Sequence, residues 1–306
     1  MTGSGIPLPE GAQVSAPIEA TGTWRQRLIG VRADSTFFIG LIGLLLVSGL
    51  ILTAVLAPLL APYDPTERVG LPFMPPSAAH PLGTNDIGQD LASELIYGTR
   101  VSLTVGIVAA AVAMVIGTAV GVLAGFYPRL VGSLLMRFVD VLLIIPFLPL
   151  LIILAAYLGR SLFNTILIIG ILIWAGTARV IRSQVLSLAH RDYVTAARAL
   201  GASDARIISR HILPRVLLLG ISQFVQATSG AILLEASLSF LGLGDPLQKS
   251  WGSILYWAQV RGAFLTDAWL WWVVPPGLMI GAAALGFALM GFALEHRINP
   301  QLQATR

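Results

Sequence analysis

Long runs of apolar residues, separated by short polar segments, divide this chain of 306 residues. With a window of about 20 residues for a helix that crosses a bilayer, these runs predict six membrane-spanning helices. We place the helices near residues 37–60, 101–126, 138–158, 164–182, 215–241 and 270–294. The pattern therefore predicts an all-α, polytopic membrane protein.

Composition supports a membrane protein over a soluble one. The chain is 56% hydrophobic and only 11% charged, against about 25% charged residues in soluble domains, and its mean hydropathy is +0.82. The first apolar run, residues 36–61, is longer than the roughly 7–15 residues of a signal-peptide core, so we expect it to be the first transmembrane helix. Because the chain has no cysteine, it has neither a disulfide framework nor a thiolate metal site.

Positive charges fall unequally on the two sides of the predicted bundle. One side carries Arg25, Arg27, Arg32, Arg129, Arg137, Arg179, Arg182, Arg191, Arg198, Arg206, Arg210, Arg215, Arg297 and Arg306, and the other only Arg68, Arg100, Arg160, Lys249 and Arg261. The positive-inside rule therefore places both termini and the insert 183–214 in the cytoplasm. We attribute the net charge of +4 to this orientation and not to binding of nucleic acid. Residues 1–35, which are polar, are predicted to be a disordered cytoplasmic tail, and residues 296–306 a C-terminal one.

Two segments, 62–100 and 243–269, are predicted to lie outside the membrane. Prolines exclude a continuous helix through the first half of 62–100. Residues 88–97 predict a short amphipathic helix on the membrane surface, with an apolar face of Leu91, Leu95 and Ile96 and a polar face of Asp90 and Glu94. Tryptophans gather on the same side, at Trp251, Trp257, Trp269, Trp271 and Trp272. They fit an interfacial belt, with direct substrate contact as the alternative.

Small residues and prolines are the main features within the spans. GxxxG steps, which let helices approach closely, occur at Gly117, Gly121 and Gly125 and again at Gly277 and Gly281. Helix packing is the leading interpretation of these steps, and a role in a pore is the alternative. Bends are expected in the third and sixth spans, at Pro146, Pro149, Pro275 and Pro276.

Two carboxylates lie at or within the spans, Asp140 near the cytoplasmic start of the third and Glu235 inside the fifth. A carboxylate in lipid is costly and usually faces the bundle interior or a cavity. Glu235 is therefore the stronger candidate for lining or gating a path, and the alternative is a structural carboxylate tied to Ser237, Ser239 or a partner. For Asp140, the leading interpretation is an ion pair with Arg137, one turn earlier.

A charged, alanine-rich insert, residues 191–214, separates two apolar runs. It predicts two short helices, the first over residues 192–200, with Gly201 in the left-handed conformation at its end. Residues 203–204 would cap the second helix, which would stop before Pro214. Because a stiff helix–glycine–helix elbow is poorly suited to be a passive linker, we expect this insert to dock onto another protein.

The chemistry that the sequence lacks narrows the function further. It has no GxxxxGK[ST] loop, because the sole lysine, Lys249, follows Gln248 and lies on the outer side, so ATP hydrolysis by the P-loop route is excluded. The four histidines lack metal-ligand spacing, and neither a GxSxG elbow nor an HExxH helix is present. Few acids lie in the spans, which leaves little for ion coupling. We therefore expect a transport subunit, not an enzyme, that uses the energy of a partner.

Four segments carry motifs. They read His80-Pro81-Leu82-Gly83-Thr84-Asn85-Asp86-Ile87-Gly88-Gln89-Asp90; Tyr97-Gly98-Thr99-Arg100-Val101-Ser102-Leu103; Thr195-Ala196-Ala197 with Gly201 and Leu213-Pro214; and Glu235-Ala236-Ser237-Leu238-Ser239-Phe240-Leu241-Gly242-Leu243-Gly244 followed by Ser250-Trp251-Gly252. The third resembles the EAA loop of permease subunits of binding-protein-dependent ABC importers. Over residues 30–300 the set is similar to the "C" permease of the dipeptide/oligopeptide/nickel group. The chain departs from that pattern at Thr195, usually Glu, at Gln89, usually Arg, and over residues 291–300.

The resemblance implies a type I ABC importer permease fold in a bacterial or archaeal cytoplasmic membrane, with a five-helix core at 101–295. It also implies three kinds of partner beside the lipid bilayer: a second, "B"-type permease, two cytoplasmic ATPase domains that hold ATP and Mg, and an extracytoplasmic solute-binding protein. No cofactor is expected on this chain. The residues expected to contact an ATPase are Thr195, Ala196, Ala197, Gly201, Ala202, Leu213 and Pro214, and those of the outer-loop motif are His80, Pro81, Leu82, Gly83 and Thr84.

Several functions remain open from the sequence. Short peptides are the leading substrate, with larger oligopeptides, nickel or another peptide-like solute as alternatives. The competing classes are a stand-alone carrier or channel and a membrane scaffold that only anchors other subunits. A stand-alone carrier would transport without ATP or partners, whereas a scaffold would show no alternating accessibility near residues 117–125 or 235.

Overall fold

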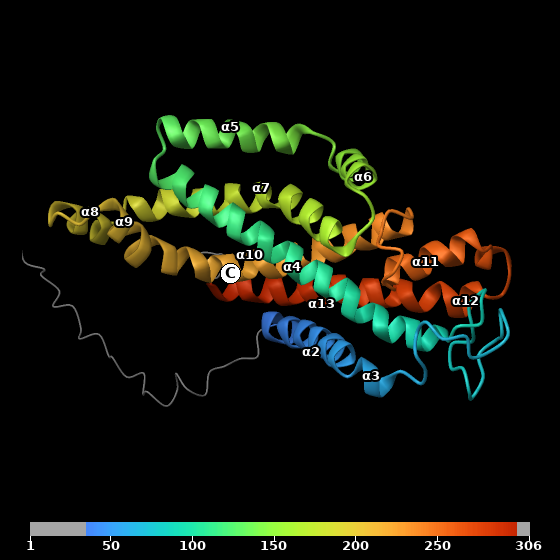
Figure 1. Ribbon diagram of the computed structural model, residues 1–306. Helices are drawn as coiled ribbons and strands as arrows, with labels where there is room; N and C mark the ends of the chain where they lie inside the picture. The colour runs from blue at the N-terminus through green and yellow to red at the C-terminus, as the bar shows by residue number, and fades with distance from the viewer. Residues whose placement is uncertain (1–34, 299–306) are drawn as a thin grey trace, which may run out of the picture. The chain divides into compact units, whose positions relative to one another are not determined.

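The computed structural model describes residues 35–298, so the predicted N-terminal tail and most of the C-terminal one lie outside the described range. Every regular element in this range is helical, which confirms the all-α expectation (Figure 1). In chain order the elements are α2 (Ser35–Val55), α3 (Ala57–Leu60), α4 (Leu91–Phe126), α5 (Leu130–Ile144), α6 (Phe147–Leu158), α7 (Leu162–Ala189), α8 (Asp192–Ala199), α9 (Asp204–Ile207), the π-helix η1 (Ile208–Ile212), α10 (Leu213–Phe240), α11 (Trp251–Val260), the 3₁₀-helix η2 (Ala263–Leu265), α12 (Trp269–Trp272) and α13 (Val274–Ile298).

Five helical stretches of the described range are long and apolar enough to cross a membrane, and α5 with α6 makes a sixth if the pair counts as one broken span. The expectation of one helix over residues 138–158 is wrong, because α5 and α6 meet at an angle of 88°. Pro146 accounts for the break, since the residue before a proline is disfavoured in the α conformation. Ile145 is accordingly extended, with φ −66° and ψ 131°.

The first glycine stripe packs α4 against α7. A Cβ atom added to these glycines would lie within 2.7 Å of Cβ atoms on α7, Gly117 facing Thr177, Gly121 facing Ile181 and Gly125 facing Val185. Packing within the chain is therefore the interpretation that the structure supports for this stripe. The second stripe differs, because Gly277 and Gly281 of α13 have no described atom within 4 Å of an added Cβ.

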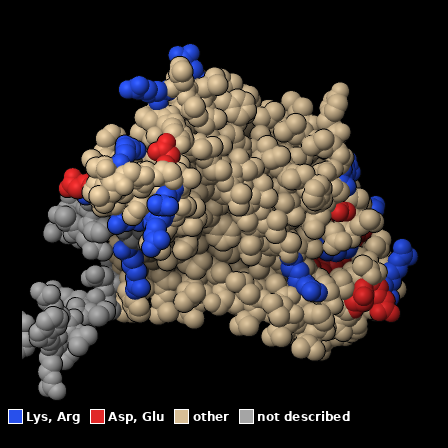
Figure 2. Space-filling model, turned by 60° about the vertical axis from the view of Figure 1, so that its left-hand side comes forward, with Lys and Arg blue, Asp and Glu red and all other residues tan. Residues whose placement is uncertain are grey.

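The helices of the described range have two distinct ends. α2 begins and α13 ends on the side where α8 and α9 lie (Figure 1), and Arg297 lies over the ring of Phe37 at 5.7 Å. We call this the elbow end, and the opposite side, with residues 61–90 and 241–273, the loop end. Figure 2 shows the charged side chains gathered near the two ends, with a mainly uncharged surface between them. An uncharged band of this kind suits the hydrocarbon core of a bilayer.

The start of α4 corrects the expectation of a separate surface helix at residues 88–97. The helix runs without a break from Leu91, and Asp90 caps it by accepting a hydrogen bond from the Ser93 amide at 2.8 Å. Leu91 and Glu94 are both only 2% exposed. The amphipathic pattern reflects one side packed on α11 and α12 and another covered by the loop-end polar groups, so this turn is buried in protein and does not lie on lipid.

Candidate functional site

The elbow turn has the geometry that its sequence predicts. α8 ends in a Schellman motif, in which the Gly201 amide donates to the Arg198 carbonyl and the Ala202 amide to the Ala197 carbonyl, both at 3.0 Å. Gly201 has φ +82°, a left-handed conformation that residues with a Cβ atom adopt at a cost. The predicted first helix and its glycine end are therefore confirmed.

The second half of the elbow differs from the prediction, which ended a separate helix before Pro214. α9 passes through the π-helix η1 directly into α10, so residues 204–240 form one continuous helical stretch. A π-turn is wider than an α-turn, and here the Leu213 amide reaches back to the Ile208 carbonyl. Pro214 then sits in the first turn of α10, where its missing N–H is tolerated. The Ser203 side chain makes no capping hydrogen bond.

The elbow packs against the helical bundle at its base and is exposed at its tip. Val194, Ile207 and Ile212 are fully buried in a cluster with residues of α4, α7 and α10. Among the predicted contact residues, Thr195, Ala196, Gly201 and Pro214 are exposed, whereas Ala197, Ala202 and Leu213 pack against that cluster. Sequence reasoning missed Leu200, which is 89% exposed at the end of α8. Its side chain adds apolar surface to the exposed tip of the elbow.

Glu235 lies in the interior, between three helices, and is 2% exposed. Its two oxygens accept hydrogen bonds from the hydroxyl groups of Ser102 on α4, at 3.1 Å, and Ser239 on α10, at 2.7 Å. The Ser102 hydroxyl oxygen in turn accepts from the Trp251 amide at the start of α11, at 3.2 Å. The carboxylate thus ties α10 to α4 and, through Ser102, to α11, while Ser237 bonds instead to the Leu233 carbonyl.

Asp140 does not pair with Arg137 as expected. Its Oδ1 lies 2.6 Å from Nη2 of Arg179 on α7, and both side chains are more than half exposed. The two helices face each other here, with the rings of Phe138 and Trp174 stacked at 6.2 Å. An arginine on the facing helix therefore meets Asp140 head-on, and the pair links α5 to α7.

The outer-loop motif forms a buried hairpin of polar contacts in front of α4. His80 Nδ1 lies 3.1 Å from Asp90 Oδ1, and the Thr84 hydroxyl donates to the Leu71 carbonyl at 2.6 Å. Gly83 has φ +69°, and a Cβ there would lie 2.2 Å from the Met74 carbonyl oxygen. Pro81 is exposed, while Leu82 packs against Trp272 and its neighbours. The motif therefore shapes the loop and presents little of itself at the surface.

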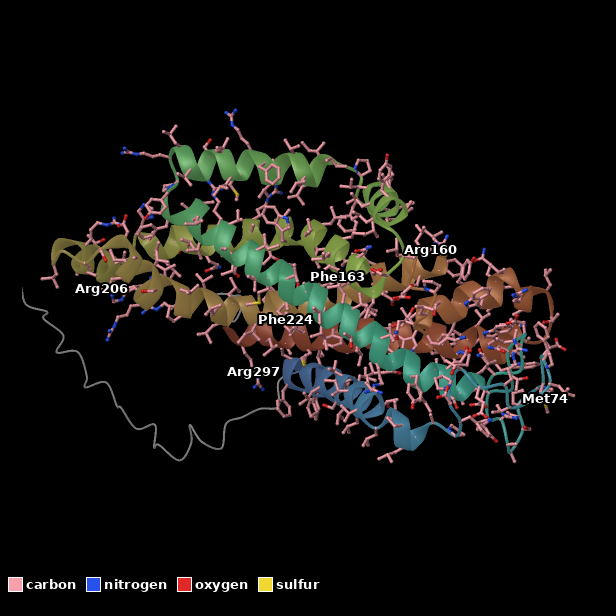
Figure 3. The ribbon with its side chains drawn as sticks, in the orientation of Figure 1. Met74, Arg160, Phe163, Arg206, Phe224 and Arg297 are labelled. Atoms are coloured by element: carbon pink, nitrogen blue, oxygen red, sulfur yellow. The ribbon has the colours of Figure 1, made fainter. Side chains whose placement is uncertain are left out.

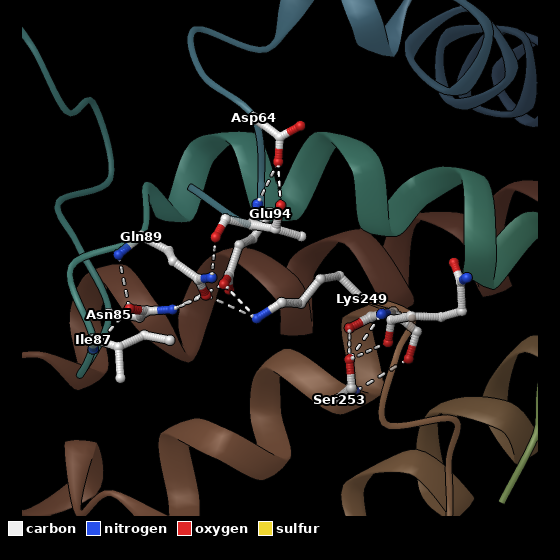
Figure 4. A network of polar contacts seen from close by, with 10 residues as sticks. Asp64, Asn85, Ile87, Gln89, Glu94, Lys249 and Ser253 are labelled. Atoms are coloured by element: carbon white, nitrogen blue, oxygen red, sulfur yellow. Dashed lines mark hydrogen bonds and ion pairs between the residues drawn. The ribbon is translucent and has the colours of Figure 1, made fainter. Parts of the chain in front are cut away.

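Next to this hairpin lies a polar network that sequence reasoning did not find (Figure 4). Lys249 Nζ donates to Glu94 Oε1 at 2.7 Å and to Gln89 Oε1 at 3.0 Å. Asn85 Nδ2 donates to the same two oxygens, at 2.8 and 2.9 Å, and Gln89 Nε2 donates to the Thr66 carbonyl at 2.8 Å. The sole lysine of the chain thus joins the loop before α11 to the loop before α4. The one signal of this network in the sequence was that Lys249 is the sole lysine of the chain.

Four of the five loop-end tryptophans divide into two groups, which corrects the single interfacial belt. Trp251 and Trp272 are 0% and 1% exposed and belong to the core, and Trp251 Nε1 donates to the Leu95 carbonyl at 3.3 Å. Trp257 and Trp269 are 36% and 44% exposed, as an interfacial position requires.

Comparisons with known proteins agree with this architecture. The family model described as "binding-protein-dependent transport system inner membrane component" matches residues 117–303. A di/tripeptide transport system permease of Pseudomonas aeruginosa is 38% identical, over 85% of this chain and 88% of its own length. A dipeptide transport system permease of Haemophilus influenzae is 36% identical, over 86% and 90%. An oligopeptide transport system permease of Bacillus subtilis is 32% identical, over 92% and 90%.

Proposed function

The chain belongs to the family of binding-protein-dependent transport system inner membrane components, and we propose that it forms half of the translocation pathway of an ATP-driven importer of short peptides. Family membership and the apolar helices make it a multi-pass permease subunit of the cytoplasmic membrane. The peptide substrate is supported by relatives that are named as di/tripeptide, dipeptide and oligopeptide permeases and that match more than four fifths of the chain.

The elbow is the proposed contact with an ATPase subunit, and its continuity with α10 carries this proposal. The turn at Gly201 is rigid, its tip is exposed, and its second half continues without interruption into α10. A displacement of the tip is therefore transmitted along a single helical stretch, residues 204–240, as far as Glu235 and the loop end. Rigid elements of this kind are what energetic coupling between distant sites requires.

The remaining partners are those that the proposed importer would need. A second permease would complete the pathway, two ATPase domains would hold ATP and Mg at the elbow end, and a solute-binding protein would deliver the peptide at the loop end. The arginine distribution supports this orientation, because Arg191, Arg198, Arg206, Arg210 and Arg215 all lie on or beside the elbow. Figure 3 shows Arg206 at that end and Arg160 near the start of α7, toward the loop end.

The proposed function is tested with the complete importer in proteoliposomes. We expect uptake of a dipeptide such as alanylphenylalanine that requires both ATP and the solute-binding protein. Uptake by this chain without ATP or partners would establish a stand-alone carrier instead. ATP-dependent uptake of nickel but of no peptide would show that nickel, the alternative substrate, is what the importer carries. Binding of an ATPase subunit without any transport by the complete assembly would leave only a scaffold.

A further inference from the structure

A small cavity of about 190 Å³ lies at the loop end, between the start of α7, the end of α10 and the start of α11. Its wall includes Arg160, Asp245, Gln248, Lys249, Tyr256 and Trp257. Its charged and aromatic side chains distinguish it from the mainly apolar groove between α4 and α10. None of the residues predicted to contact an ATPase, to gate the path or to form the outer-loop motif lines it.

The charged groups of this cavity leave one cation without a partner. Both oxygens of Asp245 already accept backbone hydrogen bonds, from Leu162 at 2.9 Å and Leu247 at 2.8 Å. Lys249 is held by Glu94. Arg160, by contrast, is exposed, and no hydrogen bond, ion pair or ring contact joins its side chain to another residue within 35–298. The group free to bind a ligand is therefore positive, and an anion is the ligand that it favours.

We propose that this cavity, the Arg160 pocket, binds the C-terminal carboxylate of a peptide on its way into the importer. A guanidinium group matches a carboxylate with two parallel hydrogen bonds. The rings of Tyr256 and Trp257 would cover the last side chain of the peptide. The Arg160 guanidinium attracts a carboxylate and repels an ammonium group, so the C-terminal end of the peptide is the end that it favours. This inference rests on the proposed peptide substrate.

The size of the cavity decides how much of the peptide it holds. Pockets that enclose a whole small ligand measure roughly 300–1,000 Å³. The Arg160 pocket is smaller, so it accommodates one end of a peptide and leaves the rest outside. Such a site reads the terminus and tolerates differences in length and sequence.

A single engineered cysteine tests the Arg160 pocket directly, since the chain has no native cysteine. Gln248→Cys places a thiol in the wall at an exposed side chain that forms no hydrogen bond with the other described residues. The labelling rate is measured on the complete importer in lipid nanodiscs, with an anionic sulfonate methanethiosulfonate and its cationic trimethylammonium analogue. We expect the anionic reagent to be favoured, and alanylphenylalanine, but not its C-terminal amide, to slow labelling.

Arg160→Gln in the Gln248→Cys background should abolish the preference for the anionic reagent and weaken protection by the dipeptide about tenfold, the loss of one charge-assisted contact. Arg68→Gln is the matched control, because Arg68 is also an exposed arginine at the loop end. Equal protection by the dipeptide and its amide, or protection unchanged by Arg160→Gln, would overturn the proposal. So would slowing that appears only with the solute-binding protein, since the pocket would then contact that protein.

Failure of this proposal and failure of the proposed function give different results. Uptake of alanylphenylalanine is measured on the same preparations without the cysteine. Normal uptake with no carboxylate-dependent protection removes the Arg160 pocket and leaves the peptide importer. Absence of uptake for every peptide tested removes the peptide importer, whatever the labelling shows.

Discussion

Replacing Gly201 by valine strains the elbow turn and touches nothing else. No described atom lies within 4 Å of a Cβ added at Gly201, so the added Cβ meets open space. Its cost arises from the backbone, because φ is +82° and an L-residue with a Cβ pays roughly 1–2 kcal/mol for the left-handed conformation. Valine, which is β-branched, belongs at the upper end of that range.

This strain is similar in size to the free energy of the hydrogen bonds that close the turn. Two backbone hydrogen bonds close the Schellman motif, at 3.0 Å each, and each contributes about 0.5–1.5 kcal/mol net. A strain of about 2 kcal/mol therefore opens the turn in a large fraction of molecules, a shift of about 30-fold in the equilibrium. Membrane insertion should be unaffected, because Val194, Ile207 and Ile212 anchor the elbow independently of the turn.

The assay is uptake and substrate-stimulated ATP hydrolysis by the complete importer in proteoliposomes. We expect Gly201→Val to lower both by at least about tenfold while the amount of the subunit in the membrane stays normal. The matched control is Gly262→Val, because Gly262 also has a positive φ, +73°, and open space around an added Cβ, but lies at the loop end. Wild-type transport by Gly201→Val would refute docking through the turn. An equal loss in Gly262→Val would attribute the effect to backbone strain in general.

Three further predictions concern the polar contacts. If Glu235 gates the path, Glu235→Gln lowers uptake, although glutamine keeps the shape of the side chain and one acceptor oxygen. Wild-type uptake and basal ATPase activity in this variant would leave Glu235 only its role in tying α4 to α10. Lys249→Met should lower the free energy of unfolding by about 3 kcal/mol, because Glu94 becomes a buried carboxylate without its cation. Adding Glu94→Gln should restore part of this loss in thermal unfolding. If the effects of the two substitutions simply added, that would argue against the ion pair. Asp140→Asn should change stability by less than about 1 kcal/mol, because its ion pair with Arg179 is exposed; a larger loss of thermal stability would show that the pair fastens α5.

Local signals in the sequence were sufficient wherever short-range physics decides the structure. The end of α8 is an example, because an alanine-rich helix followed by Gly201 specifies its own hydrogen-bonded end. The break between α5 and α6 was predicted only in part. Pro146 predicted a bend, but the angle of 88° did not follow from the sequence. The junction at Pro214 was mispredicted because a π-turn, absent from simple helix rules, accommodates the proline.

Contacts between distant residues were beyond such signals. Ser102 and Glu235 are 133 positions apart, and Lys249 and Glu94 are 155 apart. Asp140 was assigned to Arg137 because only same-helix neighbours can be enumerated from a sequence, whereas its partner, Arg179, lies on another helix. The Arg160 pocket belongs to the same class, since its wall comes from two loops and two helices.

The sequence by itself determined that this chain is an all-helical membrane protein with an elbow set between its apolar runs, because hydrophobic length and glycine placement act over a few neighbouring residues. Only the tertiary structure decided that the elbow is continuous with α10, that Glu235 and Lys249 each join separate elements, and that Arg160 has no partner among residues 35–298. These features depend on which helices lie side by side. That is settled by packing over the whole described bundle, and no single stretch of residues encodes it.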